Sequence, residues 1–244
     1  MDLSAPISVP ILAATTRGLV SRAGSTRAAL AWLAERERGE VVVDVTAADV
    51  RPRLLDRGGR RELSAAVKRQ GQRVVGLDLL IPAEHFESTA TADRAVGAVA
   101  DAIALAADVR GLGAAHDEPI VCVTMGSEPI DGAIAAIGAA AERDGVRAAL
   151  LGGPECELLE AVELGPMARS GVDAASRVAQ IGARLGVVRV DRFDRRTLTQ
   201  VGACVGAMSV ASPAAFGVAD LTDSADAGRA LEACADVWAG PMGG

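Results

Sequence analysis

Short apolar runs alternate with longer amphipathic segments along nearly the whole of this 244-residue chain. The runs are almost continuously apolar, as in Val41-Val42-Val43, which is typical of parallel strands buried on both faces of a sheet. We expect seven strands, at residues 7–13, 41–45, 74–81, 120–125, 146–151, 160–164 and 187–190. Helices are predicted at residues 26–38, 60–70, 91–109, 130–143, 172–185 and 224–234, and residues 237–238 are predicted as the stub of an eighth strand.

This order of elements favours an α/β fold of the TIM (β/α)8-barrel type, whose usual length is roughly 250 residues. The eighth unit, at the carboxyl end, is expected to be shortened or irregular. The main alternative is a doubly wound open sheet, which usually has a glycine-rich turn after its first strand. The corresponding turn, Ala14-Thr15-Thr16-Arg17-Gly18, lacks that pattern. No long flexible linker divides the sequence, so we expect one domain over residues 1–244.

Composition excludes several classes of function. A net charge of −7 argues against nucleic-acid binding, because neutralising phosphates requires a basic face. The chain has two histidines, and its single lysine, Lys68, is the only residue available for a Schiff base. The four cysteines are not spaced as zinc ligands or a redox pair, which favours a reducing compartment. The sequence shows neither a secretory leader nor an apolar stretch long enough to cross a bilayer, so we expect a cytoplasmic protein without a membrane partner.

In a barrel of this type the active site is built from residues that follow the strands. Five residues in the last part of a predicted strand or beyond it are predicted as catalytic: Asp44, Asp78, His85, Glu155 and Asp191. Three are predicted to bind a ligand: Arg189, Arg192 and Ser127. Arg189 and Asp191 alternate with valines and therefore share one face of their strand. Other interpretations remain open for these residues: a self-paired surface network for segment 189–196, a solvated loop for His85 and a plain tight turn for residues 152–155.

Six segments of the sequence share their pattern with a known family. The first three are Leu55-Asp56-Arg57-Gly58-Gly59-Arg60-Arg61-Glu62-Leu63, Val74-Val75-Gly76-Leu77-Asp78 and the helix-like segment 91–108. The later three are Glu163-Leu164-Gly165-Pro166, Ser170-Gly171-Val172-Asp173 and Gly186-Val187-Val188-Arg189-Val190-Asp191. Together they resemble the xylose-isomerase-like TIM barrels, the sugar phosphate isomerase/epimerase group, over residues 26–194.

The resemblance implies a divalent metal (Mn, Mg or Zn) held by Glu, Asp, His and Glu from the later strands. These positions fall near Leu151, at Gly165, at Arg189 or Asp191, and beyond Trp238. Leucine and glycine side chains are not metal ligands, and an arginine repels a cation. We therefore assign no metal ligands and no cofactor, and expect a metal only if other residues rebuild the site.

The resemblance implies a sugar (phosphate) isomerase/epimerase-like barrel that acts on or binds a small carbohydrate or sugar phosphate. The alternative is a non-catalytic descendant that serves as a ligand- or partner-binding module, with Arg189 and Arg192 holding an anionic ligand. A metal-independent lyase or aldolase is a third hypothesis, and the absence of a lysine at a strand end argues against its Schiff-base form. Whether the chain is an enzyme, and whether it forms a homo-oligomer, stay open at this stage.

Overall fold

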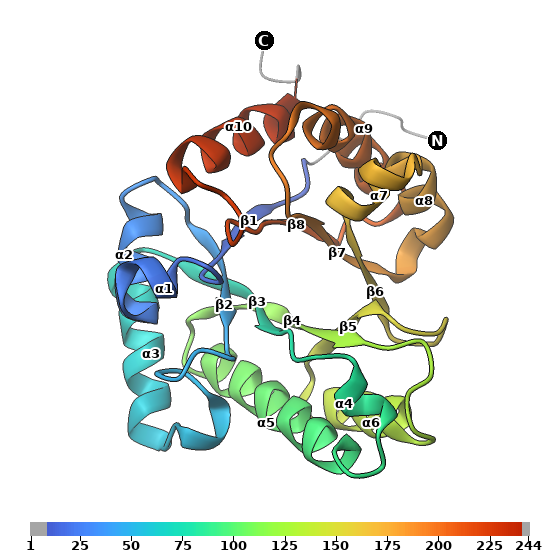
Figure 1. Cartoon of the computed structure of the whole chain (residues 1–244). Coiled ribbons are helices and arrows are strands. Elements are labelled where there is room, and N and C mark those ends of the chain that lie inside the picture. Colours follow the sequence, from blue (N-terminus) through green and yellow to red (C-terminus); the bar gives the residue numbers. More distant parts are fainter. Residues whose placement is uncertain (1–8, 241–244) are drawn as a thin grey trace, which may run out of the picture.

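Eight parallel strands pair in sequence order and close into a barrel, which confirms the predicted TIM-type fold (Figure 1). The structure is a computed structural model and describes residues 9–240. The strands are β1 (Leu12–Thr15), β2 (Glu40–Asp44), β3 (Arg73–Leu79), β4 (Ala115–Met125), β5 (Arg147–Gly152), β6 (Leu159–Glu163), β7 (Leu185–Val190) and β8 (Phe216–Ala219). Figure 1 shows them around a common centre, with the helices outside.

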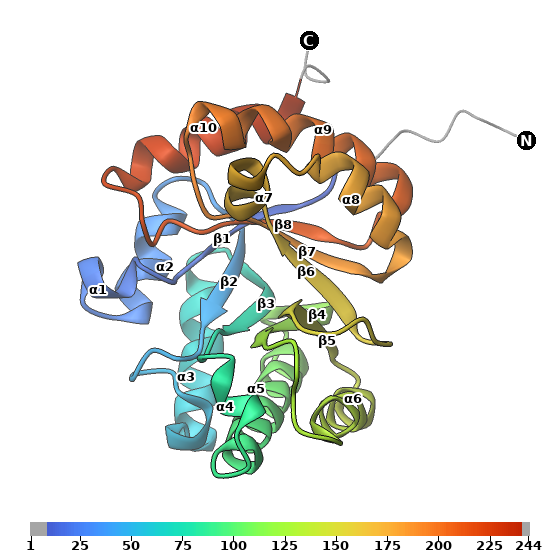
Figure 2. The same cartoon turned by 45° about the vertical axis from the view of Figure 1, so that its right-hand side comes forward.

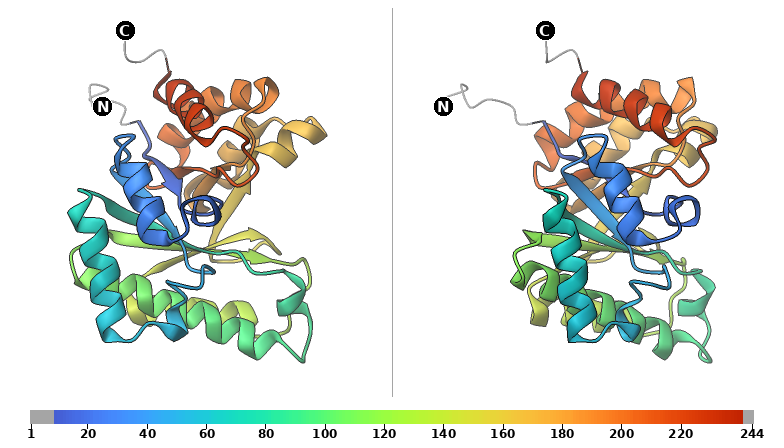
Figure 3. Two further views of the ribbon diagram at one scale, coloured as in Figure 1. Left: turned by 60° about the vertical axis from the view of Figure 1, so that its left-hand side comes forward. Right: turned by 90° about the vertical axis from the view of Figure 1, so that its left-hand side faces the viewer.

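The helices pack on the outer surface of the barrel. They are α1 (Val20–Ala23), α2 (Thr26–Ala34), α3 (Arg57–Arg69), α4 (Glu84–Glu87), α5 (Ala92–Gly111), α6 (Ala133–Asp144), α7 (Leu164–Ser170), α8 (Ala174–Ile181), α9 (Arg195–Ala211) and α10 (Ala227–Ala239), with 3₁₀ turns at Pro52–Leu54 and Gly182–Arg184. Five of them begin at a side chain that accepts a hydrogen bond from the first turn: Ser25, Asp56, Asp173, Asp194 and Asp226. Helix α5 lies along β3 and β4, on one side of the molecule in Figure 3.

The predicted eighth strand at residues 237–238 is wrong, because these residues belong to α10. The buried positions of α10 follow helical spacing through Ala227, Leu231, Cys234 and Trp238, so the apolar stripe continues to the end of the helix. The true eighth strand is β8, and α9 before it was also not predicted. The predicted first strand starts within residues 1–8, outside the described part of the chain, and the observed one begins at Leu12.

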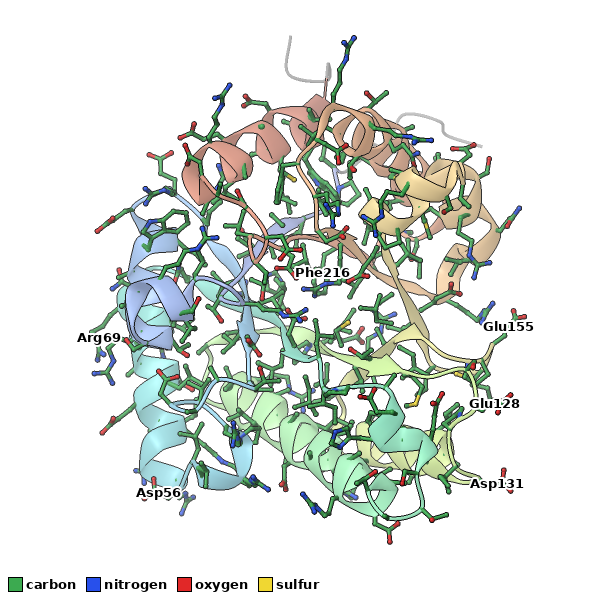
Figure 4. All side chains as sticks on the ribbon, viewed as in Figure 1. Asp56, Arg69, Glu128, Asp131, Glu155 and Phe216 are labelled. Atoms are coloured by element: carbon green, nitrogen blue, oxygen red, sulfur yellow. The ribbon has the colours of Figure 1, made fainter. Side chains whose placement is uncertain are left out.

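The inside of the barrel is apolar at one end and polar at the other. Ten buried side chains form the apolar part: Ala13, Val42, Val75, Ile120, Cys122, Ala149, Ala161, Val187, Phe216 and Val218. Phe216 lies near the centre of the ring of strands in Figure 4. Further along the same strands, toward their carboxyl ends, the buried side chains become Thr15, Asp44, Asp78, Arg189 and Asp220. This change places a polar mouth at the end of the barrel where TIM-barrel sites occur.

The connection from β5 to β6 contains no helix, as Figure 2 shows. Residues 153–158 run directly from the end of β5 to the start of β6. Arg177 of α8 pairs with Glu160 of β6 beside this loop. None of the helices between residues 9 and 240 combines the length and the apolar content that a membrane span requires.

Candidate functional site

A buried ion cluster lies inside the barrel where β3, β7 and β8 end. Arg189 Nη1 donates to Asp78 Oδ1 and Arg189 Nη2 to Asp220 Oδ2, each over 2.7 Å. Thr15 Oγ1 donates to Asp78 Oδ2 over 2.8 Å. Arg17, at the edge of the mouth, places Nη1 3.6 Å from Asp220 Oδ2. We call Arg17, Asp78, Arg189 and Asp220 the Arg189 cluster; its two positive and two negative side chains balance.

The environment of the Arg189 cluster shifts the pKa values of its members. Burial opposes ionisation of Arg189, yet Asp78 and Asp220 raise the pKa of its guanidinium well above the ordinary value. Burial raises the pKa of the Asp78 carboxyl, against the effect of Arg189. Burial also acts on Asp220, but Arg189 and the Thr222 hydroxyl hold the pKa of Asp220 below its ordinary value. Arg189 is therefore a permanent cation whose two Nη groups each hold a carboxylate.

Three more carboxylates surround the mouth beyond this cluster, and we call Asp44, Glu163 and Asp191 the rim carboxylates. Asp44 Oδ1 accepts hydrogen bonds from Thr46 N over 2.9 Å and Thr46 Oγ1 over 2.5 Å. Asp191 Oδ1 accepts from Gly165 N over 2.7 Å. A Cβ atom at position 165 would lie 2.5 Å from Asp191 Oδ2, so a glycine is required for this close approach.

Glu163 differs from the other two rim carboxylates. It ends β6 beside Arg189 in the strand register, is half-buried, and accepts no hydrogen bond from any described residue. Burial raises the pKa of its carboxyl, and the negative charge of Asp191 raises it further. In the strand order β6 is four strands from β2, so Glu163 and Asp44 lie on opposite sides of the barrel. A carboxyl group that holds its proton above the usual pH is suited to proton transfer.

The structure brings together four of the eight predicted site residues. Asp44, Asp78, Arg189 and Asp191 all lie in the mouth. The interpretation of segment 189–196 as a surface network is wrong for Arg189, which is fully buried. That Asp78 and Arg189 form an ion pair was not predicted.

The other four predicted residues lie elsewhere. Glu155 is not at the mouth: its side chain is 81% exposed and pairs with Arg184, which precedes β7, and Figure 4 shows it at the periphery. The chain turns down the barrel wall directly after β5, which carries Glu155 away from the strand end. His85 lies on α4 and lines a separate cavity outside the barrel wall. Ser127 and Arg192 are exposed in the loops after β4 and β7.

Sequence reasoning missed Arg17, Glu163, Asp220 and Thr15 as members of the site. Glu163 follows Leu159 and Ala161 at a spacing of two along β6, so it lies on the same inward face of the strand. Asp220 continues Phe216, Val218 along β8 in the same way. This period of two was the available signal, but it identifies Asp220 only once β8 has been recognised.

The divalent metal implied by the resemblance does not fit the residues present. Leu151 of β5 packs with the apolar interior, and Arg189 occupies β7 with its charge directed at Asp78 and Asp220. Asp220, the acid that follows β8, is therefore already paired with a cation. Over residues 9–240, no three His, Cys, Asp or Glu side chains come together as metal ligands would. Arg189 thus places a positive charge at a position where the resemblance implies a metal ligand.

Comparisons with known proteins agree with the barrel fold. No protein-family model matches the sequence, and neither does any curated protein. Among solved structures, a D-psicose 3-epimerase studied with D-fructose matches with a TM-score of 0.65 and 9% identity, over 94% of this chain and 97% of that one. An L-ribulose 3-epimerase matches with a TM-score of 0.61 and 14% identity, over 87% and 81% of the two chains.

A sugar phosphate isomerase/epimerase from Parabacteroides distasonis matches over nearly its whole length. Its TM-score is 0.64 at 10% identity, and the match covers 98% of this chain and 99% of that one. This chain therefore shares its fold with sugar epimerases and isomerases. The predicted resemblance to the xylose-isomerase-like barrels is thus confirmed for the fold. At these identities the likeness of this barrel to its neighbours concerns the fold, and the site residues have to be argued from the barrel's own geometry.

Proposed function

We propose that this epimerase-like barrel binds a small carbohydrate at its mouth and transfers a proton on it without a metal ion. One observation carries the proposal: the carboxyl of Glu163, whose pKa is raised, lies across the barrel from Asp44, and the Arg189 cluster between the strand ends is neutral as a whole. The neighbouring folds are those of sugar epimerases and isomerases, which supports a sugar as the ligand.

The rim carboxylates suit a ligand with many hydroxyl groups. Ionised carboxylates accept hydrogen bonds, and each sugar hydroxyl has a proton to donate. Because the Arg189 cluster is neutral as a whole, the carboxylates of Asp44 and Asp191 leave the mouth negative even where Glu163 holds its proton. An uncharged sugar is therefore favoured there over a sugar phosphate.

The arrangement allows a proton to leave one face of a carbon atom and return on the other. A base on one side removes the proton from the carbon next to a carbonyl group, and the electron pair moves to the carbonyl oxygen. As the electron pair returns from the oxygen and the carbonyl re-forms, an acid on the opposite side donates a proton to the same carbon, which inverts it. Asp44 and Glu163 lie on opposite sides of the mouth and are the two acid–base groups. Arg17, whose side chain is 36% exposed, is the cation that can stabilise the negative charge on the carbonyl oxygen of the ligand. Such acid–base groups contribute about 10²–10⁴-fold each to a rate.

Hydrogen–deuterium exchange of sugar carbon-bound protons tests this directly. The protein is treated with EDTA, mixed with ketopentoses and ketohexoses in D₂O, and followed by NMR. We expect deuterium to enter next to the carbonyl carbon, and Glu163→Gln and Asp44→Asn to lower the rate about 100-fold or more. Glu128→Gln is the matched control, since Glu128 is exposed and lies at the periphery in Figure 4.

Two outcomes would contradict the proposal in different ways. Sugar binding without exchange would favour the non-catalytic binding module. Exchange that requires added Mn²⁺ would contradict the metal-independent reaction while leaving the sugar as the ligand.

A further inference from the structure

A cavity of about 260 Å³ lies outside the barrel wall where β2 and β3 end. Its apolar floor includes Val45, which follows β2, and Leu79, which ends β3. Side chains at these positions point away from the mouth, because Asp44 and Asp78 beside them point into it. The cavity is thus separated from the mouth by the strand ends and is not part of the proposed carbohydrate site.

Cationic side chains dominate the rest of its lining. Arg51, Arg53 and Arg94 line the cavity together with His85, against a single acid, Asp101. The three arginines and Asp101 give a local charge of +2 in a chain whose net charge is −7. Concentrated positive charge around a small cavity attracts anions.

Within the described part of the chain, no carboxylate pairs with these three arginines. Within residues 9–240, none of Arg51, Arg53 and Arg94 has a carboxylate within 4.0 Å of its guanidinium nitrogens. Arg51 Nη2 donates to the carbonyl oxygen of Thr46 over 3.1 Å, which orients its guanidinium and leaves its charge uncompensated. Arg53 and Arg94 are exposed at the cavity edge.

A second arginine-lined cavity, between α3 and α5, provides a comparison. It is lined by Arg57, Arg60 and Arg61, but there Arg60 pairs with Asp108. It also lies on the side of the barrel, away from the strand ends where TIM-barrel sites are built. Each of the two cavities is lined by three arginines, so they differ in the pairing of Arg60 with Asp108 and in their position on the barrel.

We propose that the cavity between the ends of β2 and β3 binds the phosphate group of a small organic phosphate. Guanidinium groups bind phosphate oxygens through paired, charge-assisted hydrogen bonds, and a dianion suits the excess of two positive charges. The apolar floor of Val45, Leu79 and Ile81 receives the carbon part of the ligand. Because the volume of about 260 Å³ is below that of most drug-sized sites, the ligand is small. This proposal does not depend on a sugar binding at the mouth.

Calorimetry with defined anions tests the proposal. The probes are inorganic phosphate, glycerol 3-phosphate and acetate, titrated at low salt into the full chain, the Arg53→Ala/Arg94→Ala variant and the matched control Arg57→Ala/Arg61→Ala. We expect glycerol 3-phosphate to bind more tightly than inorganic phosphate, and acetate to bind at least tenfold more weakly than either. The first variant is expected to weaken phosphate binding at least tenfold and the control less than twofold. All four positions are exposed, so both variants should fold, which circular dichroism checks.

The controls separate a site from general attraction to positive charge. Equal weakening in the two double variants would overturn the proposal, because it would show binding to net charge alone. Equal affinity of inorganic phosphate and glycerol 3-phosphate would overturn the assignment of the apolar floor. If the wild-type chain binds phosphate in this cavity but binds no sugar at the mouth, the proposed function is contradicted and the phosphate site is not.

Discussion

The Arg189 cluster and the rim carboxylates lie in the same barrel mouth but differ in how their charges are satisfied. In the cluster every carboxylate has a cationic partner within 3.6 Å, and Arg189 is fully buried. Among the rim carboxylates, Asp44 and Asp191 accept hydrogen bonds from neutral groups, and Glu163 from no described residue. The contrast suggests that the cluster stabilises the fold and that the rim is free to act on a ligand.

Removing Arg189 should have the largest effect on stability. The Arg189→Met variant leaves Asp78 buried without a cation and Asp220 with only the partly exposed Arg17, and breaking a buried ion pair in this way costs about 3–5 kcal/mol. Chemical denaturation should therefore show a loss of that size in the free energy of unfolding. That is a large share of the roughly 5–15 kcal/mol that holds a typical domain together.

A charge-free version of the cluster is the control. In Asp78→Asn/Arg189→Met/Asp220→Asn no buried charge remains, and we expect most of the lost stability to return. A loss below about 1 kcal/mol for Arg189→Met alone would show that the cluster is not a structural element, and the contrast with the rim would fail.

Glu163→Gln should have a smaller effect of opposite sign that depends on pH. Because the folded-state pKa of Glu163 is raised above its ordinary value of 4.5, ionisation at higher pH destabilises the folded chain. Wild type should therefore lose stability as the pH rises from 4.5 through the raised pKa, and Glu163→Gln should lack this step. Denaturation at a series of pH values measures the difference. A variant that is less stable than wild type at pH 7 would show that Glu163 is a structural residue like Asp220.

Glu155→Gln should have the smallest effect. The Glu155 side chain is 81% exposed and its pair with Arg184 is on the surface, so the free energy of unfolding should change by no more than about 0.5 kcal/mol. Deuterium exchange into a bound sugar should also be unchanged. A strong loss of exchange would place Glu155 in the site after all and remove the distinction between mouth and periphery.

Much of the barrel could be predicted from the sequence, because buried parallel strands are apolar runs that local reading can detect. Asp44, Asp78, Arg189 and Asp191 could be predicted to lie at the strand ends for the same reason, since each continues or follows such a run. Strand β8 was missed because it has only four residues, Phe216–Ala219, one of them glycine. Gly217 leaves room for the Trp238 ring, whose Nε1 donates to Pro10 O over 2.7 Å. That packing depends on residues far apart in the sequence.

The pairing inside the mouth could not be predicted from local patterns. Asp78 and Arg189 are separated by 111 positions, and only closure of the barrel brings them together. Glu155 illustrates the opposite error: it follows an apolar run, yet the missing helix after β5 sends it down the outer wall. The position of a residue along a strand could be predicted from the sequence, whereas the path of a loop could not.

The helix-free link between β5 and β6 also makes the barrel a scaffold that can be extended. Residues 153–158 span the height of the wall with no helix to displace, and Glu155 and Glu157 are exposed there. Added length in a surface loop costs little, roughly 0.6 kcal/mol for each doubling. A peptide tag or a small binding module inserted after Glu155 would be displayed at the flank of the barrel, leaving the mouth and the phosphate cavity untouched.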